Sequence, residues 1–169
     1  HHVPSVTSMP VYLGQLDEIL NPYVKILTQD EIDSRIKRFW RYLDRTLPDA
    51  FMHANIGPAD TPVTRAILRA DAELKQVAPN LTFIYDPDVT PDDLLLSVAK
   101  NICGCSKPHI SNGPVNDKIF TKGRYGVVSC YNSLPLAGGG STLVRLNLKA
   151  IAEHSRSPED FFTRTLPHY

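Results

Sequence analysis

The chain is organised around residues 124–141, which read RYGVVSCYNSLPLAGGGS. The run from Tyr125 to Ser129 predicts a strand that leads directly into Cys130. Asn, Ser and Pro at 132–135 are expected to end regular structure, and three glycines precede a second predicted strand that starts at Ser141. A cysteine between two strands has a position fixed by a scaffold, as reactive side chains usually do. The alternative is a free cysteine that packs as a small hydrophobic side chain, the more common fate of an intracellular thiol.

Composition narrows the classes of partner. The 169 residues include 18 basic and 18 acidic side chains, so we expect no nucleic acid and no membrane as partner. The longest apolar runs are shorter than a bilayer span, and no stretch has the layout of a signal peptide. The chain has three cysteines, an odd number that cannot form a complete set of disulfides, and this favours a reducing, cytoplasmic setting. The chain lacks an initiator Met and ends within a predicted element, so we interpret it as a piece of a longer protein.

Strands alternate with helices along the sequence. The predicted strands lie at residues 50–56, 81–85, 125–129 and 141–148. The predicted helices lie at residues 11–20, 29–46, 62–77, 91–101 and from 158 onward, and residues 102–124 are expected to be irregular. Thr28 and Glu31 fit a capping box, and Thr61 and Ser157 are expected to cap the helices that follow them. Apolar residues recur at helical spacing within 29–46, among them Ile32, Ile36 and Trp40, which predicts an amphipathic helix.

The order of strands and helices predicts an α/β fold with a largely parallel sheet. The strands look apolar on both faces, which suits a parallel sheet covered on both sides. We expect residues 1–169 to form a single partial domain without an internal boundary.

Other cysteine and glycine motifs suggest chemistry only weakly. Cys103 and Cys105 precede His109, but structural zinc sites usually use two pairs of ligands with two to four residues inside a pair. We therefore predict no metal there, and interpret the two thiols as lining a cavity from a loop. A cysteine hydrolase would need a histidine base beside Cys130, and no local pattern ties a histidine to it. The glycines at 138–140 lack the spacing of a phosphate-binding loop.

Three stretches in this order resemble the central part of glycyl-radical enzymes such as pyruvate formate-lyase. They are PNLTFIY at 79–85, RYGVVSC at 124–130 and TLVRLNLK at 142–149. The likeness is closest to the YjjI branch of that family, to which CGCSKPH at 103–109, SNGP at 111–114 and PLAGGGS at 135–141 are also similar. The resemblance covers most of residues 30–150, and the ordered set of motifs carries it rather than any one of them.

The resemblance implies a fold and a mechanism. The family fold is a ten-stranded α/β barrel made of two half-barrels, each with five parallel strands. Two loops meet inside the barrel: one carries a thiyl-forming cysteine, which by position is Cys130, and the other a glycine that becomes a backbone radical. A separate S-adenosylmethionine-dependent activase installs that radical in the C-terminal part, so this chain itself is expected to bind no cofactor. The candidate substrate-binding residues are Cys105, His109, Asn112 and Asn132.

Three departures from the family pattern leave the reaction open. No stretch matches the Arg-Val-x-Gly-Tyr-like signature of the glycine loop. Ser129 stands beside Cys130, where pyruvate formate-lyase has two adjacent cysteines. Asn132 stands where the diol and glycerol dehydratase branch has a glutamate, so the expected general base of that branch is missing.

Three hypotheses follow. In the first, the chain is the cysteine-loop part of a glycyl-radical enzyme and is inactive without the glycine loop. Its partners are then the remainder of the barrel, the activating enzyme, a small-molecule substrate and a second copy in a homodimer. In the second, the chain is a small α/β binding or structural domain in which Cys130 is only packed. In the third, it is a self-contained cysteine-dependent enzyme.

Overall fold

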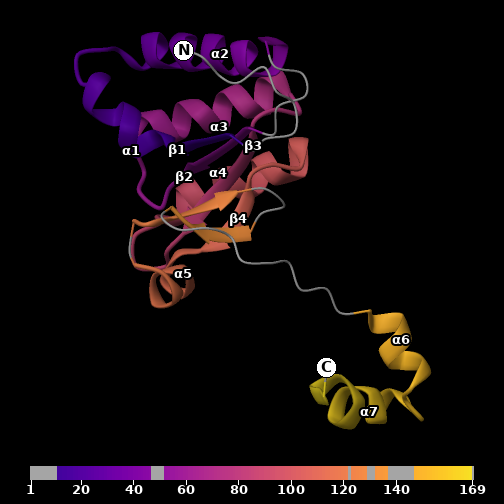
Figure 1. Cartoon of the computed structure of the whole chain (residues 1–169). Helices are drawn as coiled ribbons and strands as arrows, with labels where there is room; N and C mark the ends of the chain where they lie inside the picture. Colours follow the sequence, from indigo (N-terminus) through magenta and orange to yellow (C-terminus); the bar gives the residue numbers. More distant parts are fainter. Residues whose placement is uncertain (1–10, 47–51, 122, 129–131, 137–146, 169) are drawn as a thin grey trace. The chain divides into compact units, whose positions relative to one another are not determined.

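The computed structural model describes residues 11–46, 52–121, 123–128, 132–136 and 147–168. Contacts divide the chain into two compact units, residues 1–138 and residues 139–169 (Figure 1). Whether the chain is one partial domain of a longer protein stays a prediction.

The first unit is an α/β structure. Its helices are α1 (Leu16–Leu20), α2 (Gln29–Thr46), α3 (Pro62–Leu74), α4 (Asp92–Cys105) and α5 (Gly113–Ile119), with a 3₁₀ turn at Asn21–Tyr23. Its strands are β1 (Val11–Gln15), β2 (Met52–Ile56), β3 (Asn80–Tyr85), β4 (His109–Asn112), β5 (Tyr125–Val128) and β6 (Asn132–Pro135). The first four strands form a parallel sheet in the order β1-β2-β3-β4, and β5 pairs with β6 antiparallel. The predicted alternation of helices with a parallel sheet is confirmed.

The long helices begin where side chains cap them. At the start of α2 the Thr28 amide donates to the Glu31 carboxylate at 2.9 Å, and the Glu31 amide donates to the Thr28 hydroxyl at 3.4 Å. This reciprocal pair is the predicted capping box. At α3 the Thr64 amide donates to the Thr61 hydroxyl at 3.1 Å, and Pro62 occupies the first turn, where its missing amide costs nothing.

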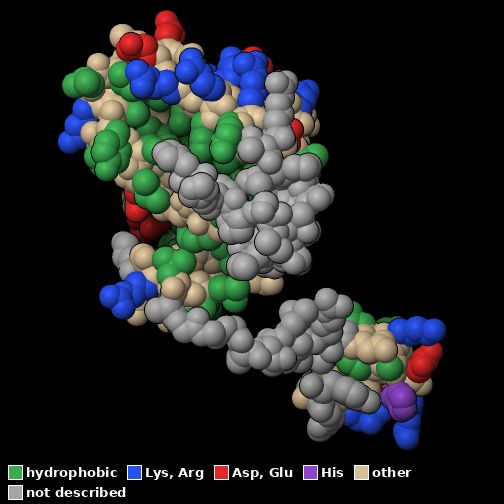
Figure 2. Space-filling model, turned by 45° about the horizontal axis from the view of Figure 1, so that its top comes forward, with side chains coloured by type: hydrophobic (Ala, Val, Ile, Leu, Met, Phe, Trp, Pro, Cys, Tyr) green, Lys and Arg blue, Asp and Glu red, His purple; other side chains and the backbone are tan. Residues whose placement is uncertain are grey.

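The hydrophobic core lies on one face of the sheet. Alternate residues of the central strands, among them Ala54, Ile56 and Phe83, are fully buried against apolar side chains of α2, α3 and α4. Helix α2 packs on α3, and α3 packs on α4 (Figure 1). The opposite side of α2 carries Lys and Arg side chains, which gather at that edge of the unit in Figure 2.

Several local predictions were wrong. Residues 11–15 form strand β1 rather than the first turns of a helix, because they pair with β2, and tertiary pairing overrides weak local propensity. Helix α4 continues to Cys105 and ends where Ser106 adopts a left-handed φ of 61°. Residues 102–124, expected to be irregular, contain β4 and α5 as well as the end of α4.

The region after Cys130 also differs from the prediction. Residues 132–135 were expected to end regular structure, yet they form β6, and Val128 pairs with Asn132. The strand begins there because the backbone of β5 offers it a partner, a long-range effect that Asn, Ser and Pro propensities do not capture. The strand predicted at 141–148 lies mostly outside the described residues, and Leu148 already begins a helix.

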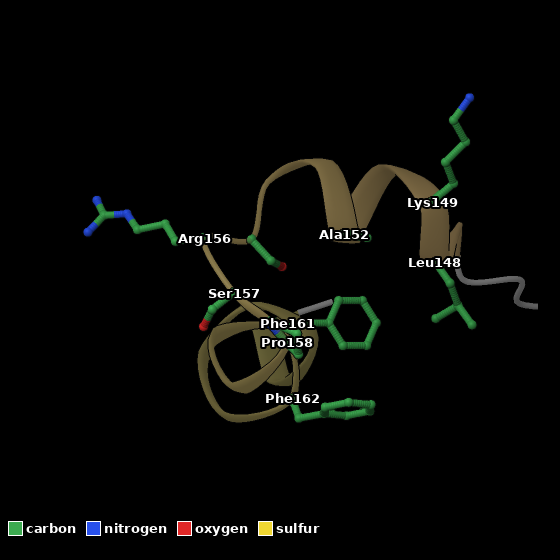
Figure 3. A pocket seen from close by; sticks show the side chains of 9 residues that line it. Leu148, Lys149, Ala152, Arg156, Ser157, Pro158, Phe161 and Phe162 are labelled. Carbon is green, nitrogen blue, oxygen red and sulfur yellow. The ribbon is translucent and has the colours of Figure 1, made fainter.

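The second unit is short and helical. It contains α6 (Leu148–Glu153), α7 (Pro158–Asp160), a π-turn at Phe161–Thr165 and a 3₁₀ turn at Leu166–His168. The Asp160 amide donates to the Ser157 hydroxyl at 3.1 Å, which confirms the predicted cap. Leu148, Phe161 and Phe162 line a groove of about 640 Å³. Figure 3 shows these side chains from close by. No helix of the described chain is long and apolar enough to cross a membrane.

Gly57 lies directly after β2, and its conformation requires glycine. Its φ is +85°, and an added Cβ would lie 2.7 Å from the Ile84 carbonyl oxygen. We expect Gly57→Ala to lower the free energy of unfolding by about 1–3 kcal/mol, because backbone strain of this kind has that cost. Urea unfolding of the full-length protein would measure it. Gly104→Ala in α4 is the matched control, since its added Cβ would have no atom within 4 Å apart from its chain neighbours and the local helix backbone; an equal loss there would contradict the argument.

Candidate functional site

The second face of the sheet is mostly polar. Residues paired across parallel strands share a face, and the register pairs Tyr12 with His53, Asn55 with Thr82, and Ile84 with Ser111. These side chains lie opposite the core. The prediction that the strands are apolar on both faces was therefore wrong, because period-two alternation places the polar residues of β2 on one side.

This polar face is covered. His53, Asn55 and Thr82 are each only 1% exposed. Among the described elements, β5 packs against β1 and β2, and Val127 of β5 is 2% exposed. In Figure 1 the pair β5–β6, drawn in orange, lies on the side of the sheet opposite α2 and α3. The antiparallel pair therefore forms part of the cover over a polar, water-poor surface.

One side chain links the hairpin to the sheet. The Asn55 side chain accepts from the Val127 amide at 2.9 Å and donates to the Val127 carbonyl at 3.0 Å. The Tyr12 hydroxyl donates to the same Asn55 oxygen at 3.0 Å. None of these three residues was predicted from the sequence as a site residue. The available signal was the alternation of His53 and Asn55 with apolar residues in MHANI at 52–56.

Cys130 lies outside the described residues, between the paired ends of β5 and β6. Three residues, 129–131, connect Val128 to Asn132, and Cys130 is the middle one. The partner strand starts at Asn132 and not near Ser141, which corrects the predicted geometry. That Cys130 is the thiyl-forming residue stays a prediction.

The other predicted site residues do not gather at one point. His109 begins β4, is exposed, and is paired with Thr82 on the polar face. Asn132 is the exposed first residue of β6. The Asn112 side chain caps α5, because the Val115 amide donates to it at 3.0 Å.

Cys105 lies on the other side of the sheet. Cys103 and Cys105 belong to the last turn of α4, which corrects the prediction of a loop that lines a cavity. The Cys105 sulfur lies 3.2 Å from the Asn101 carbonyl oxygen and 3.6 Å from an Asp71 carboxylate oxygen. Burial, and then the negative charge of Asp71, raise the pKa of this thiol. Its surroundings thus favour a packed thiol over a thiolate nucleophile.

Two groups of the polar face, Tyr12 and His53, are uncharged at neutral pH. Burial lowers the pKa of His53, so its ring is neutral. Burial, with smaller contributions from Tyr125 and nearby carboxylates, raises the pKa of Tyr12 to about 12. The buried part of the face, with His53, Asn55 and Thr82, therefore offers uncharged hydrogen-bonding groups.

Stability should depend on pH through His53. The unfolded chain takes up a proton near pH 6.5, whereas the folded protein holds the buried His53 neutral to lower pH. We therefore expect the free energy of unfolding to fall as the pH decreases below about 6.5, by up to about 1.4 kcal/mol per pH unit. Urea unfolding of the full-length protein at several pH values would show it. His53→Phe should flatten the profile, and His109→Gln, which removes an exposed ring, should not; an unchanged profile in His53→Phe would refute the assignment.

A cavity of about 490 Å³ opens at the carboxyl ends of β1, β2 and β3. Gly57, Asp86, Asp117 and Tyr125 are among its lining residues, and Tyr125 is the first residue of β5. Ligands of parallel sheets usually bind at this edge. Among the described residues no group of three His, Cys, Asp or Glu side chains could hold a metal ion.

Comparison with known proteins gives the family. A family model described as "Glycyl radical enzyme YjjI-like" matches residues 1–169. The chain is 88% identical over 169 residues to "Uncharacterized protein YjjI" of Escherichia coli (strain K12), a match over 100% of this chain and 33% of that protein. It is 43% identical over 166 residues to "Uncharacterized protein" of Haemophilus influenzae, over 98% of this chain and 32% of that protein. The chain thus spans about a third of the length of these curated relatives. The predicted resemblance is confirmed, and the chain belongs to the YjjI-like glycyl radical enzyme family.

Proposed function

We propose that this chain supplies the cysteine half of a radical active site, in which Cys130 relays a hydrogen atom between a glycyl radical and a small-molecule substrate. The proposal rests on the antiparallel pair β5–β6. In the sequence, Cys130 is one of the three residues that connect these strands. Strand β5 is hydrogen-bonded to Asn55 on the polar face of the sheet. The glycyl radical, outside this chain, would supply the hydrogen-atom acceptor once an S-adenosylmethionine-dependent activase has installed it.

The relay conserves atoms and electrons. The S–H bond of Cys130 breaks homolytically, its hydrogen atom joins the glycine Cα, and the unpaired electron stays on sulfur. The sulfur then takes a hydrogen atom from a C–H bond of the substrate, which restores the thiol and leaves the unpaired electron on substrate carbon. No ion forms in either step. A neutral, covered face built from Tyr12, His53, Asn55 and Thr82 suits this chemistry, because it limits access of water and other reactive molecules.

The barrel belongs to the same proposal. The sheet is parallel, has helices on one face and polar residues on the other, and ends in the edge strands β1 and β4. Such a sheet would form most of one five-stranded half-barrel, with its polar face toward the interior. Further strands of the full-length protein would then pair with the edges that β1 and β4 form among the described strands, because sheet edges favour added strands.

Solvent exchange at the glycyl radical tests the proposal without knowledge of the substrate. The single α-hydrogen of a glycyl radical splits its electron paramagnetic resonance signal into a doublet, and deuterium there collapses the doublet to a singlet. A thiol that donates hydrogen to the radical and takes it back carries deuterium from D₂O to that carbon. We expect the full-length protein, activated without oxygen, to show a doublet in H₂O and a singlet in D₂O. No radical after activation, or a doublet that persists in D₂O, would overturn the proposal and favour a packed Cys130.

A further inference from the structure

The Asn55 side chain contacts the β5 backbone as a strand would. It donates to the Val127 carbonyl at 3.0 Å and accepts from the Val127 amide at 2.9 Å, across 72 residues of sequence. A peptide group of a neighbouring strand offers the same donor and acceptor. Asn55 is 1% exposed and Val127 is 2% exposed, so water does not compete for these bonds.

The orientation of the Asn55 amide is fixed by its partners. Its oxygen accepts from two donors, the Val127 amide and the Tyr12 hydroxyl at 3.0 Å, while its nitrogen faces a carbonyl. A flipped amide would place NH₂ against the Val127 amide and oxygen against the Val127 carbonyl. Only one orientation therefore satisfies both backbone groups of Val127, and β5 is held at one register relative to β2.

Tyr12 adds a second constraint. A Cβ built on Gly126 would lie 2.7 to 2.8 Å from atoms of the Tyr12 ring, so the β5 backbone lies directly on that ring. The hydroxyl of the same ring is bonded to Asn55. The ring sets how closely β5 approaches the sheet, and the Asn55 amide sets where along the sheet Val127 is held.

We infer that Asn55, supported by Tyr12, is a positioning residue for Cys130. The inference rests on the proposed function, since it concerns the same radical site. Val127 stands three residues before Cys130 in the sequence, so the position of Val127 limits where Cys130 can lie. Transfer of a hydrogen atom requires near contact of the two partners, and a misplacement of about 1 Å can lower a rate about 100-fold.

Substitutions of Asn55 test the inference in the full-length, activated protein. Asn55→Leu removes all three hydrogen bonds, and we expect deuterium exchange at the glycyl radical to slow by about 10-fold to 100-fold. The amount of radical per chain should stay normal. Tyr12→Phe keeps the ring and loses one bond, so its exchange should slow less.

Asn55→Asp offers a readout that a purely structural role would not produce. A protonated carboxyl has the amide's shape, accepts at one oxygen and donates at the other, whereas a carboxylate repels the Val127 carbonyl. Burial shifts the pKa of such a carboxyl toward neutrality. We expect exchange in this variant to recover as the pH falls from about 9 to about 6. Nearby Tyr12 and Tyr125 stay protonated over this range, because burial raises the pKa of both, and His53 stays neutral over most of it.

A matched control separates position from stability. Leu94 is fully buried in the helix-covered core, and Leu94→Ala should destabilise the fold without touching the hairpin. Its melting temperature should fall at least as far as that of Asn55→Leu, while exchange at the radical stays normal. Equal slowing in both variants would overturn the positioning role, and so would normal exchange in Asn55→Leu.

A second measurement does not depend on the radical. Amide hydrogen exchange, followed by mass spectrometry on a peptide that covers residues 125–135, should be faster in Asn55→Leu than in the wild type and unchanged in Leu94→Ala. If the full-length protein forms no radical, the proposed function fails, while this experiment still tests whether Asn55 holds β5. Unchanged protection of that peptide in Asn55→Leu would refute the inference itself.

Discussion

A Cys130→Ser variant of the full-length protein is expected to carry the glycyl radical and to retain its doublet signal in D₂O. Serine preserves the shape of the side chain, so folding and installation of the radical should be normal. Its O–H bond is too strong for a glycyl radical to break, so the relay stops at this residue. Loss of deuterium exchange and of all turnover is the largest effect that we predict for any substitution.

Two thiols in the same chain provide controls. Cys103 is exposed in α4, and Cys105 lies beside Asp71 on the helix side of the sheet. Cys103→Ser and Cys105→Ser should each keep a D₂O singlet. A singlet in Cys130→Ser would remove Cys130 from the mechanism, and loss of the singlet in one of the controls would transfer the assignment to that thiol.

Asp71→Asn is expected to cause the largest loss of stability, about 3–5 kcal/mol in the free energy of unfolding. The Asp71 carboxylate is fully buried and lies 2.8 Å from the Lys107 amino group. It also accepts from the Trp40 indole at 3.2 Å and from the Asn101 amide at 3.4 Å. Removing its charge leaves the Lys107 cation, 9% exposed, without its buried counter-charge.

Urea unfolding of the full-length protein would measure this loss. Asp33→Asn is the matched control: Asp33 pairs with Arg69 at 2.6 Å, but the two side chains are 29% and 49% exposed. An exposed pair contributes about 0–1 kcal/mol, so the control should change stability little. A loss below about 1 kcal/mol in Asp71→Asn would show that the buried pair contributes no more than a surface pair.

Interactions within a few residues were predictable from the sequence. The capping pairs Thr28–Glu31, Thr61–Thr64 and Ser157–Asp160 were recognised, because a cap depends on residues three positions apart. Helix α2 followed from apolar spacing, and its residues Ile32, Ile36 and Trp40 are buried as predicted. The motif order in 79–149 also sufficed for the family, since that information lies in the residues themselves.

Interactions between distant residues were decided by the tertiary structure alone. Strands β1, β4 and β6 have weak local signals, and each exists because a neighbouring strand offers its backbone groups. The polar face became visible only when the register paired Asn55 with Thr82. Asn55 and Val127 are 72 residues apart, and the sequence around either residue does not indicate the other. Whether a side chain can bond to a distant backbone group depends on where folding places that backbone. No local sequence pattern contains this information.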